Sequence, residues 1–395
     1  MDSGRFGIAC DIGTSRLEGA LVDISRRRSV SFRSVVNDQR LFGPDVISRL
    51  AVASSGPSGL ARLSDAALAG VRRLIRVLLD DARVEPGEVG RILCVGNSAM
   101  HHLVLSLPPE ALARSPFAPS HVGKVFRCAA GDIGLSVCGN ARFEFLPNLG
   151  GFVGSDALAV MVACGMPSSR TPILAVDIGT NGEVMLGDAS RSFVASTSAG
   201  PAFEGWHFSC GMPAVEGAVE SVRLRGGRLI IRTIGGVRPK GICGSGLIDA
   251  VQILVDLGIV DRTGRMRPSS FRVCPGVVLT RRDVREVQLA KAAIQAAVKV
   301  LRRRYGPAKI GTVVLAGRFG ALISKASARS IGILPGDAAL NRVRALRHGA
   351  LDGAKMIIAS PRAERTALEF CRRTVHVELH AEKSFQDEFV AAMRF

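Results

Sequence analysis

The sequence predicts a two-lobed α/β protein, and three observations support this fold class. One stretch occurs twice, at Phe6–Asp23 and at Leu174–Asp188: an apolar run, then Asp-Ile-Gly-Thr, then a second apolar run. This pattern is typical of a strand, a polar turn and a returning strand. Helical and strand patterns alternate after each copy. The 395 residues, 47% of them hydrophobic, suffice for two or three folded domains. We therefore expect two lobes, 1–170 and 171–395, with a cleft between them.

The first lobe is expected to continue with helices and a buried strand. In Ser64–Ala82 apolar residues recur every three or four positions, which predicts an amphipathic helix. Arg91–Gly96 is a short apolar run and indicates a buried strand. Leu146–Cys164 begins glycine-rich and then predicts a helix of small residues whose N-terminus lies near Ser155 or Asp156.

The second lobe is also expected to contain helices and a strand after its hairpin. Gly235–Gly246 is punctuated by glycines and leads into a predicted helix at Leu247–Leu257. The longest predicted helix is Asp283–Arg304. A predicted strand, Thr312–Ala316, and a glycine turn, Gly317–Gly320, follow it.

The chain carries a formal net charge of +18, which raises the question of a nucleic-acid partner. Its arginines are scattered along the chain, and aromatic residues make up only 5%, so few side chains are available to stack on bases. An acidic protein partner is therefore favoured over nucleic acid.

The nine cysteines include no CxxC pair, so we expect no zinc ribbon, thioredoxin site or iron–sulfur cluster held by this chain. No apolar run reaches the roughly 20 residues of a membrane span, and the N-terminus lacks the apolar core of a secretory signal. These features predict a cytoplasmic protein without a membrane partner.

The two predicted turns have the chemistry of a phosphate site. Glycines and small polar residues expose backbone N–H groups that suit phosphate oxygens. The candidates are Gly13, Thr14, Ser15, Gly179, Thr180, Asn181 and Gly182. Asp11 and Asp177 precede the turns, and we expect them to hold a hydrated Mg²⁺ or to orient an attacking water. The simpler alternative is that both aspartates only cap good hairpin turns. No Walker A motif competes for this role, because Gly123-Lys124 is followed by Val125.

These motifs resemble the superfamily of acetate and sugar kinases, heat-shock ATPases and actin. Asp11–Thr14 and Asp177–Thr180 match its two phosphate hairpins, Ser155–Ala159 its connecting helix, and Val314–Gly320 its adenosine turn. The resemblance implies an actin-like ATPase fold, with duplicated ribonuclease H-like domains, a nucleotide cleft between them, and ATP and Mg²⁺ as cofactors.

Further stretches resemble one family, the ATP-dependent reductive activators of corrinoid proteins. They include NDQRLFGPDVISRL, VGNSAMHHL, GGFVGSDALA, GICGSGLIDA and DVREVQLAKAAI, in order and over nearly the whole chain. The resemblance implies that the chain uses ATP to return a corrinoid-binding protein of a methyltransferase system from inactive cob(II)alamin to cob(I)alamin. Because this chain has no cluster-spaced cysteines, the electron is expected from a separate ferredoxin-like iron–sulfur protein. A homodimer is left open.

The resemblance also suggests roles for individual residues. Asp156 would orient the attacking water, with a plain helix cap as the alternative. Glu204 would act as a base or support a ligand, or else form a loop salt bridge. The nucleotide is expected along Gly244, Ser245, Gly246, Gly317, Arg318, Phe319 and Gly320. Phe319 is expected to pack inward rather than on the base.

Some positions depart from the family pattern. Arg16 follows the first turn, where the family has a small hydroxyl residue, and it could grip phosphate or block it. His348 and Asp352 lie where a turn rich in glycine and asparagine is expected beside the adenosine. These departures keep two alternatives open: a small-molecule kinase of the same superfamily, and a non-catalytic nucleotide- or partner-binding module. His101 and His102 point about 100° apart on a predicted helix, so we expect them to be structural.

Overall fold

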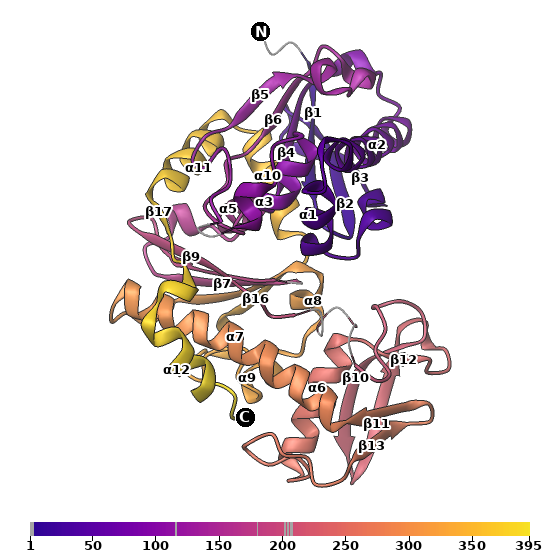
Figure 1. Cartoon of the computed structure of the whole chain (residues 1–395), viewed down its shortest axis with the longest axis vertical. Coiled ribbons are helices and arrows are strands. Elements are labelled where there is room, and N and C mark those ends of the chain that lie inside the picture. The colour runs from indigo at the N-terminus through magenta and orange to yellow at the C-terminus, as the bar shows by residue number, and fades with distance from the viewer. Residues whose placement is uncertain (1–3, 115–116, 180, 201–202, 204, 206–207) are drawn as a thin grey trace. The chain divides into compact units, whose positions relative to one another are not determined.

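The computed structural model describes residues 4–114, 117–179, 181–200, 203, 205 and 208–395, and Figure 1 labels most of their helices and strands. The chain forms two compact units. Unit 1 contains Met1–Ser169, Asp188–Ser192 and His348–His376, and unit 2 contains Arg170–Gly187, Phe193–Arg347 and Val377–Phe395. The units therefore differ from two continuous blocks divided near residue 170, because residues 188–192 and 348–376 pack within unit 1.

Unit 1 is built on a mixed six-stranded sheet in the order β3-β2-β1-β4-β6-β5. Its strands are β1 (Phe6–Ile12), β2 (Arg16–Asp23), β3 (Arg28–Val36), β4 (Val89–Gly96), β5 (Phe126–Ala129) and β6 (Arg142–Phe145). β1 pairs antiparallel with β2 and parallel with β4. The first Asp-Ile-Gly-Thr stretch thus forms the predicted hairpin, in the middle of the sheet.

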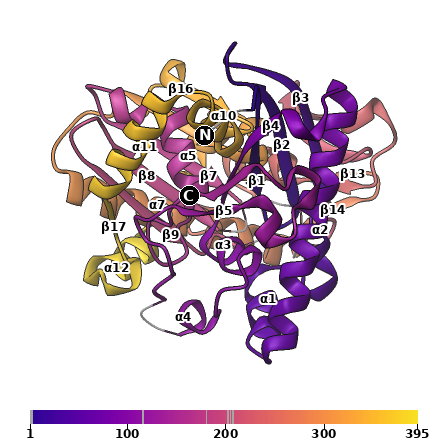
Figure 2. The same ribbon diagram turned by 90° about the horizontal axis from the view of Figure 1, so that it is seen from above.

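Helices cover this sheet. They are α1 (Val46–Ala53), α2 (Pro57–Ala82), α3 (Ser98–Val104), α4 (Glu110–Ala113), α5 (Ser155–Ala163), α10 (Gly349–Ile358) and α11 (Pro361–Arg373), and the short strand β17 (Thr374–His376) follows α11. α2 contacts β2 and β3 with its apolar stripe. α5 and α10 lie side by side in unit 1 (Figures 1 and 2). They approach closely at Gly353, where a Cβ atom would lie 1.9 Å from the carbonyl oxygen of Ala159.

A charge network joins three strands and a helix of unit 1. Glu144 on β6 has no exposed surface and accepts hydrogen bonds from Arg91 on β4 and, at 2.8 Å, from Arg127 on β5. Arg91 also pairs with Glu364 of α11 at 2.8 Å. Each buried charge thus has a partner, which a desolvated ion requires, and the network ties α11 to the sheet.

Unit 2 repeats the strand arrangement of unit 1. Five strands of its central sheet lie in the order β16-β15-β7-β8-β9. They are β7 (Ile173–Ile178), β8 (Gly182–Gly187), β9 (Ser192–Thr197), β15 (Thr312–Ala316) and β16 (Val343–Leu346). β7 pairs antiparallel with β8 and parallel with β15, as β1 does with β2 and β4. The repeated sequence motif therefore reflects a repeated supersecondary unit.

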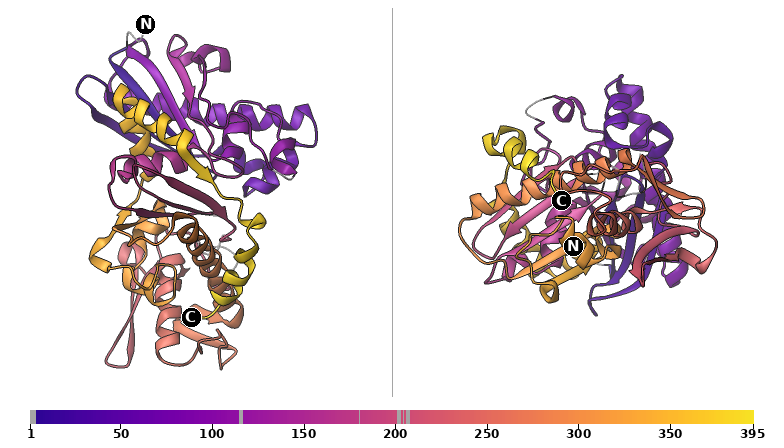
Figure 3. Two further views of the ribbon diagram at one scale, coloured as in Figure 1. Left: turned by 90° about the vertical axis from the view of Figure 1, so that its left-hand side faces the viewer. Right: turned by 90° about the horizontal axis from the view of Figure 1, so that it is seen from below.

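The helices of unit 2 are α6 (Gly244–Asp256), α7 (Arg281–Tyr305), α8 (Gly317–Leu322), α9 (Lys325–Ser330) and α12 (Lys383–Ala391). α12 lies along α7 (Figure 3). The prediction of a turn at Gly317–Gly320 is wrong in part, because the chain bends only at Gly317, whose φ is +79°, and then continues as the helix α8.

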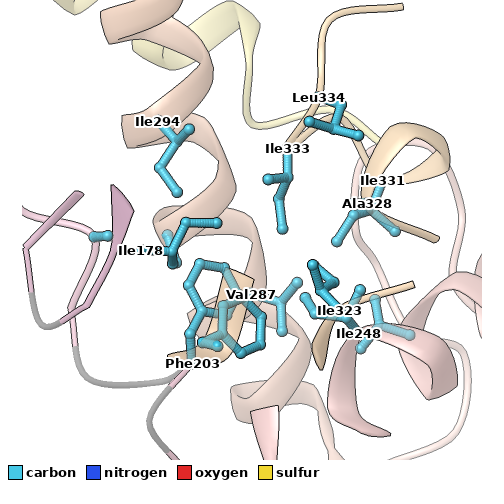
Figure 4. Packing of buried hydrophobic residues seen from close by; sticks show 14 of the residues in the cluster. Ile178, Phe203, Ile248, Val287, Ile294, Ile323, Ala328, Ile331, Ile333 and Leu334 are labelled. Atoms are coloured by element: carbon cyan, nitrogen blue, oxygen red, sulfur yellow. The ribbon is translucent and has the colours of Figure 1, made fainter. Parts of the chain in front are cut away.

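Two smaller sheets complete unit 2. One has the order β11-β10-β12, with β10 (Ala218–Arg225), β11 (Arg228–Thr233) and β12 (Gly241–Ile242), and the other pairs β13 (Ser270–Cys274) with β14 (Val277–Thr280). Figure 4 shows part of the core, where Ile178, Phe203 and Val287 meet. In the described residues no helix is long and apolar enough to cross a membrane.

Candidate functional site

The hairpin of unit 2 places Asp177 beside a tight glycine. Asp177 is the last residue but one of β7, and a Cβ atom on Gly317 would lie 2.5 Å from its Oδ1. This close approach, together with a φ of +79° at Gly317, favours glycine next to this carboxyl group. After Asp177 the loop closes with a hydrogen bond from Gly179 N–H to the carbonyl oxygen of Asn181, 3.0 Å long. Thr180, the central loop candidate, lies outside the described residues.

A second acidic residue, which the sequence analysis missed, faces Asp177. Glu183 on β8 is its direct cross-strand partner, so both side chains project from the same face. Burial raises the pKa of Asp177 to about 6, and a hydrogen bond from Ile178 N–H opposes that rise only in part. Two like charges opposite one another destabilise a sheet, and a cation would relieve this cost. The alternation of side chains after the turn is the signal that could have revealed Glu183.

Unit 1 repeats this arrangement. Asp11 on β1 is the direct cross-strand partner of Glu18 on β2. Glu18 accepts a hydrogen bond from His348 Nδ1 at 2.7 Å. Each hairpin therefore contains its own aspartate–glutamate pair. In unit 1 a histidine lies beside the pair, and in unit 2 the pKa of the aspartate is raised.

Side chains from three segments hold the loop of the first hairpin. Asn37 Nδ2 donates to the carbonyl oxygen of Gly13 at 2.9 Å, and Arg49 Nη1 donates to that of Thr14 at 2.7 Å. Asn97 Nδ2 donates to Thr14 Oγ1 at 3.3 Å. Both carbonyl groups are thereby held by side-chain donors, which fixes the backbone of the loop.

Arg49 is the residue here that sequence reasoning did not identify. It is fully buried on α1, and its Nε donates to the carbonyl oxygen of Gly43 at 2.9 Å. Desolvation lowers the pKa of Arg49 to about 10. Its Nη2 has no hydrogen-bond partner among the described residues. A buried cation of this kind favours an anion nearby.

We expect Arg49→Met to weaken Mg-ATP binding about tenfold or more, because charge-assisted hydrogen bonds of this type contribute roughly 1.5–3 kcal/mol. Calorimetric titration of the full chain measures this change. Arg62→Met is the matched control, since Arg62 lies over the Phe42 ring, 5.0 Å from its centroid, and among the described residues no hydrogen bond joins it to the loop. Equal Mg-ATP affinities of wild type and Arg49→Met would contradict a role for Arg49 in the nucleotide site.

The three residues that depart from the family pattern all lie in unit 1, and each has a partner there. Arg16 neither grips nor fills the first loop, because its Nε donates to Ser34 Oγ at 2.8 Å and its Nη2 to the Ser34 carbonyl oxygen at 3.0 Å on β3. His348 precedes α10 and contacts Phe32 edge-on at 5.1 Å. Asp352 pairs with Lys355 at 2.6 Å. Arg16 and His348 thus make contacts within unit 1, and Asp352 forms an ion pair along α10.

Asp156 lies in the first turn of α5. The alternative that it caps the helix is wrong, because the N-cap is Gly154 and Asp156 is the second helical residue. A Cβ atom on Gly154 would lie 2.1 Å from the Gly96 carbonyl oxygen and 2.4 Å from the Asn97 Cα atom. The start of α5 is therefore pressed against the segment whose Asn97 holds Thr14.

The candidate nucleotide residues of unit 2 cluster around two phenyl rings. Phe319 stacks on Phe203 with ring centroids 4.9 Å apart, so its predicted inward packing is confirmed. A Cβ atom on Gly244 would lie 2.1 Å from the Phe203 carbonyl oxygen and 2.9 Å from the Phe319 ring. Ser245 donates to the carbonyl oxygen of Glu220 at 2.8 Å. The starts of α6 and α8 thus meet. Glu204 lies outside the described residues.

His101 and His102 are structural, as predicted. His102 bonds the Pro108 carbonyl oxygen through Nδ1 and accepts from Ser120 N–H through Nε2, each at 2.9 Å. His101 is fully buried against the Phe145 ring. In the described part of the chain no group of three or more His, Cys, Asp or Glu side chains could hold a metal ion. Mg²⁺ remains compatible with the aspartate–glutamate pairs, because it keeps several waters and needs only one or two carboxylates.

Comparison with known proteins identifies the family. A model of the RACo middle region matches residues 6–169, and a model of the C-terminal domain of RACo, the ASKHA domain, matches residues 171–395. The chain belongs to the RACo family. The predicted resemblance is thereby confirmed, and so is the α/β, actin-like fold class, since ASKHA denotes the superfamily of acetate and sugar kinases, heat-shock proteins and actin.

Several relatives of this RACo-family chain have names that state an activity. The corrinoid activation enzyme RamQ of Eubacterium limosum is 32% identical over 420 residues, covering 99% of this chain and 70% of RamQ. The Co(II) methylated amine-specific corrinoid protein reductase of Methanosarcina barkeri is 26% identical, covering 84% of this chain and 66% of that protein. A solved reductive activator for corrinoid, iron–sulfur protein superposes with a TM-score of 0.84 at 32% identity, covering 100% of this chain and 67% of that one. The chain thus spans about two thirds of the length of these relatives.

Proposed function

We propose that this chain is an ATP-driven reductive activator of a corrinoid protein in a methyltransferase system. One observation carries the proposal. Each compact unit of a chain that belongs to the RACo family contains a hairpin loop next to an aspartate–glutamate pair, here called the loop–carboxylate unit. The reaction is a one-electron reduction of cob(II)alamin to cob(I)alamin. A separate reduced iron–sulfur protein supplies the electron and is oxidised, and ATP is hydrolysed to ADP and phosphate. We place this activity in the cytoplasm.

The chain's own residues would bind and orient the nucleotide. In each unit, backbone N–H groups of the loop after Asp11 or Asp177 would donate to phosphate oxygens. In unit 2 the nucleotide would lie along the starts of α6 and α8, at Gly244 and Gly317. Asp11 and Asp177 would each be able to hold Mg²⁺ through water, and the ion would neutralise phosphate charge. Asp156 would orient the attacking water. ATP binding and hydrolysis can drive the reduction only if the partner is bound differently in each nucleotide state.

The test mixes the chain, Mg-ATP, a cob(II)alamin-loaded corrinoid protein encoded in the same gene neighbourhood, and a reduced ferredoxin. The expected result is growth of the cob(I)alamin absorption spectrum that requires both ATP and the chain. Reactions with ADP, or without the chain, are the controls. No ATP-dependent change with any neighbouring corrinoid protein would overturn the proposal.

Two alternatives give different results in the same assay. A small-molecule kinase would form a phosphorylated product without any change at cobalt. A non-catalytic binding module would bind its partner but show no ATP turnover. Calorimetry with millimolar Mg-ATP separates the module from both ATP-using functions.

A further inference from the structure

One face of the β10–β11 hairpin carries a row of arginines that the candidate site does not use. Arg225 lies directly opposite Arg228, and Arg223 lies directly opposite Ile230. Opposed residues share a face, and so do residues two apart on one strand. These four residues therefore form one surface, here called the arginine face. All four are exposed, Ile230 by 50%.

The opposite face fixes the orientation of the arginines. Val222 is buried in the unit 2 core, and Leu229 and Ile231 pack against it. α6 contacts β10, as Figure 1 shows. The strands are joined by Gly226 and Gly227, whose φ values of +54° and +75° suit the tight two-residue turn of a hairpin. The arginine face is therefore held outward by packed structure rather than carried on a free loop.

The charges on this face are not balanced locally. Several surface arginines elsewhere pair with carboxylates, as Arg302 does with Asp337 at 2.8 Å. Among the described residues, no ion pair involves Arg223, Arg225 or Arg228, and the neighbouring pair is Arg232–Glu220 at 2.9 Å. Residues 218–240 contain six lysines and arginines but only one glutamate. Since Arg225 and Arg228 also repel each other across the strands, an acidic ligand would stabilise this face.

We propose that the arginine face docks an acidic protein surface, that of the corrinoid protein on which the chain acts. The identity of this partner rests on the proposed function. Ile230 supplies an apolar contact among the charges, as protein interfaces commonly do. Nucleic acid fits less well, because residues 218–240 contain no aromatic side chain to stack on bases. A second copy of the chain fits less well because each copy carries a net charge of +18.

The test compares the wild-type chain with Arg223→Gln/Arg225→Gln/Arg228→Gln and with Arg302→Gln/Arg303→Gln/Arg304→Gln. The control variant removes the same charge from α7, where each arginine pairs with a carboxylate. Binding to the cob(II)alamin-loaded corrinoid protein is measured by biolayer interferometry at about 50 mM and about 300 mM salt. ATP turnover by each chain alone shows whether the variants remain folded and competent.

At low salt we expect the arginine-face variant to bind the corrinoid protein about tenfold more weakly, mainly through slower association, and the control variant within about twofold of wild type. The difference should shrink at high salt. Equal affinity of both variants would overturn the docking proposal. So would arginine-face-dependent binding of a single-stranded oligonucleotide combined with unchanged corrinoid-protein binding. Failure of the proposed function gives a different result: wild type then binds or turns over ATP without producing cob(I)alamin.

Discussion

Asp177→Asn is expected to lower ATP-dependent turnover about 100-fold or more, since it removes the negative charge proposed to hold Mg²⁺ while keeping the size of the side chain. The measurement is ATP hydrolysis by the full chain, together with Mg-ATP affinity by calorimetry. Asp337→Asn is the control, because Asp337 forms an exposed ion pair on the surface of unit 2. Turnover by Asp177→Asn close to that of wild type would contradict the proposed role of Asp177 in the nucleotide site.

The same substitution should not weaken the nucleotide-free fold. The pKa of Asp177 is raised from 3.8 to about 6. Because the folded protein keeps this proton to a higher pH than the unfolded chain, the free energy of unfolding falls as the pH rises from about 4 to about 6. Above pH 6 the full loss, roughly 2–3 kcal/mol, is present. Asn carries no such cost. Urea unfolding at pH 7.5 should therefore show Asp177→Asn at least as stable as wild type, and a large loss would mean that the residue acts in folding instead.

His101→Leu is expected to make the protein less sensitive to acid. Desolvation, followed by repulsion from His102 and His121, lowers the pKa of His101 from 6.5 to about 3. The unfolded chain takes up a proton near pH 6.5 and the folded protein does not. Stability from this group is thus fully present above pH 6.5 and is lost as the pH falls towards 3. Between pH 7 and pH 4 the loss amounts to roughly 2–4 kcal/mol.

The measurement is urea unfolding of wild type and variant at pH 7 and pH 4. His101→Leu should lose roughly 2–4 kcal/mol less than wild type over this interval. His380→Leu is the control, since the His380 side chain is 59% exposed, and it should follow the wild-type profile. Equal pH dependence of wild type and His101→Leu would show that His101 is protonated in the folded state.

Local patterns were sufficient to predict the hairpins, the main helices and the family. A strand–turn–strand repeat depends on residues close in sequence, so Asp11 and Asp177 could be placed at strand ends from the sequence alone. The predicted strand Thr312–Ala316 is β15, and the predicted helix Asp283–Arg304 lies within α7. Helix starts were less certain: α2 begins at Pro57 rather than Ser64, because proline is favoured in the first turn and Gly56 precedes it.

The sequence by itself determined that one loop–carboxylate unit is used twice within an actin-like fold. Only the tertiary structure showed what surrounds each copy. It showed that Glu183 lies opposite Asp177 and that Gly317 contacts Asp177. It also showed that Arg49 hydrogen-bonds to the first loop and that Arg16 hydrogen-bonds to β3. It also put residues 348–376 into unit 1. These facts depend on cross-strand register and on contacts between distant segments, and the short-range periodicity of a sequence does not specify either.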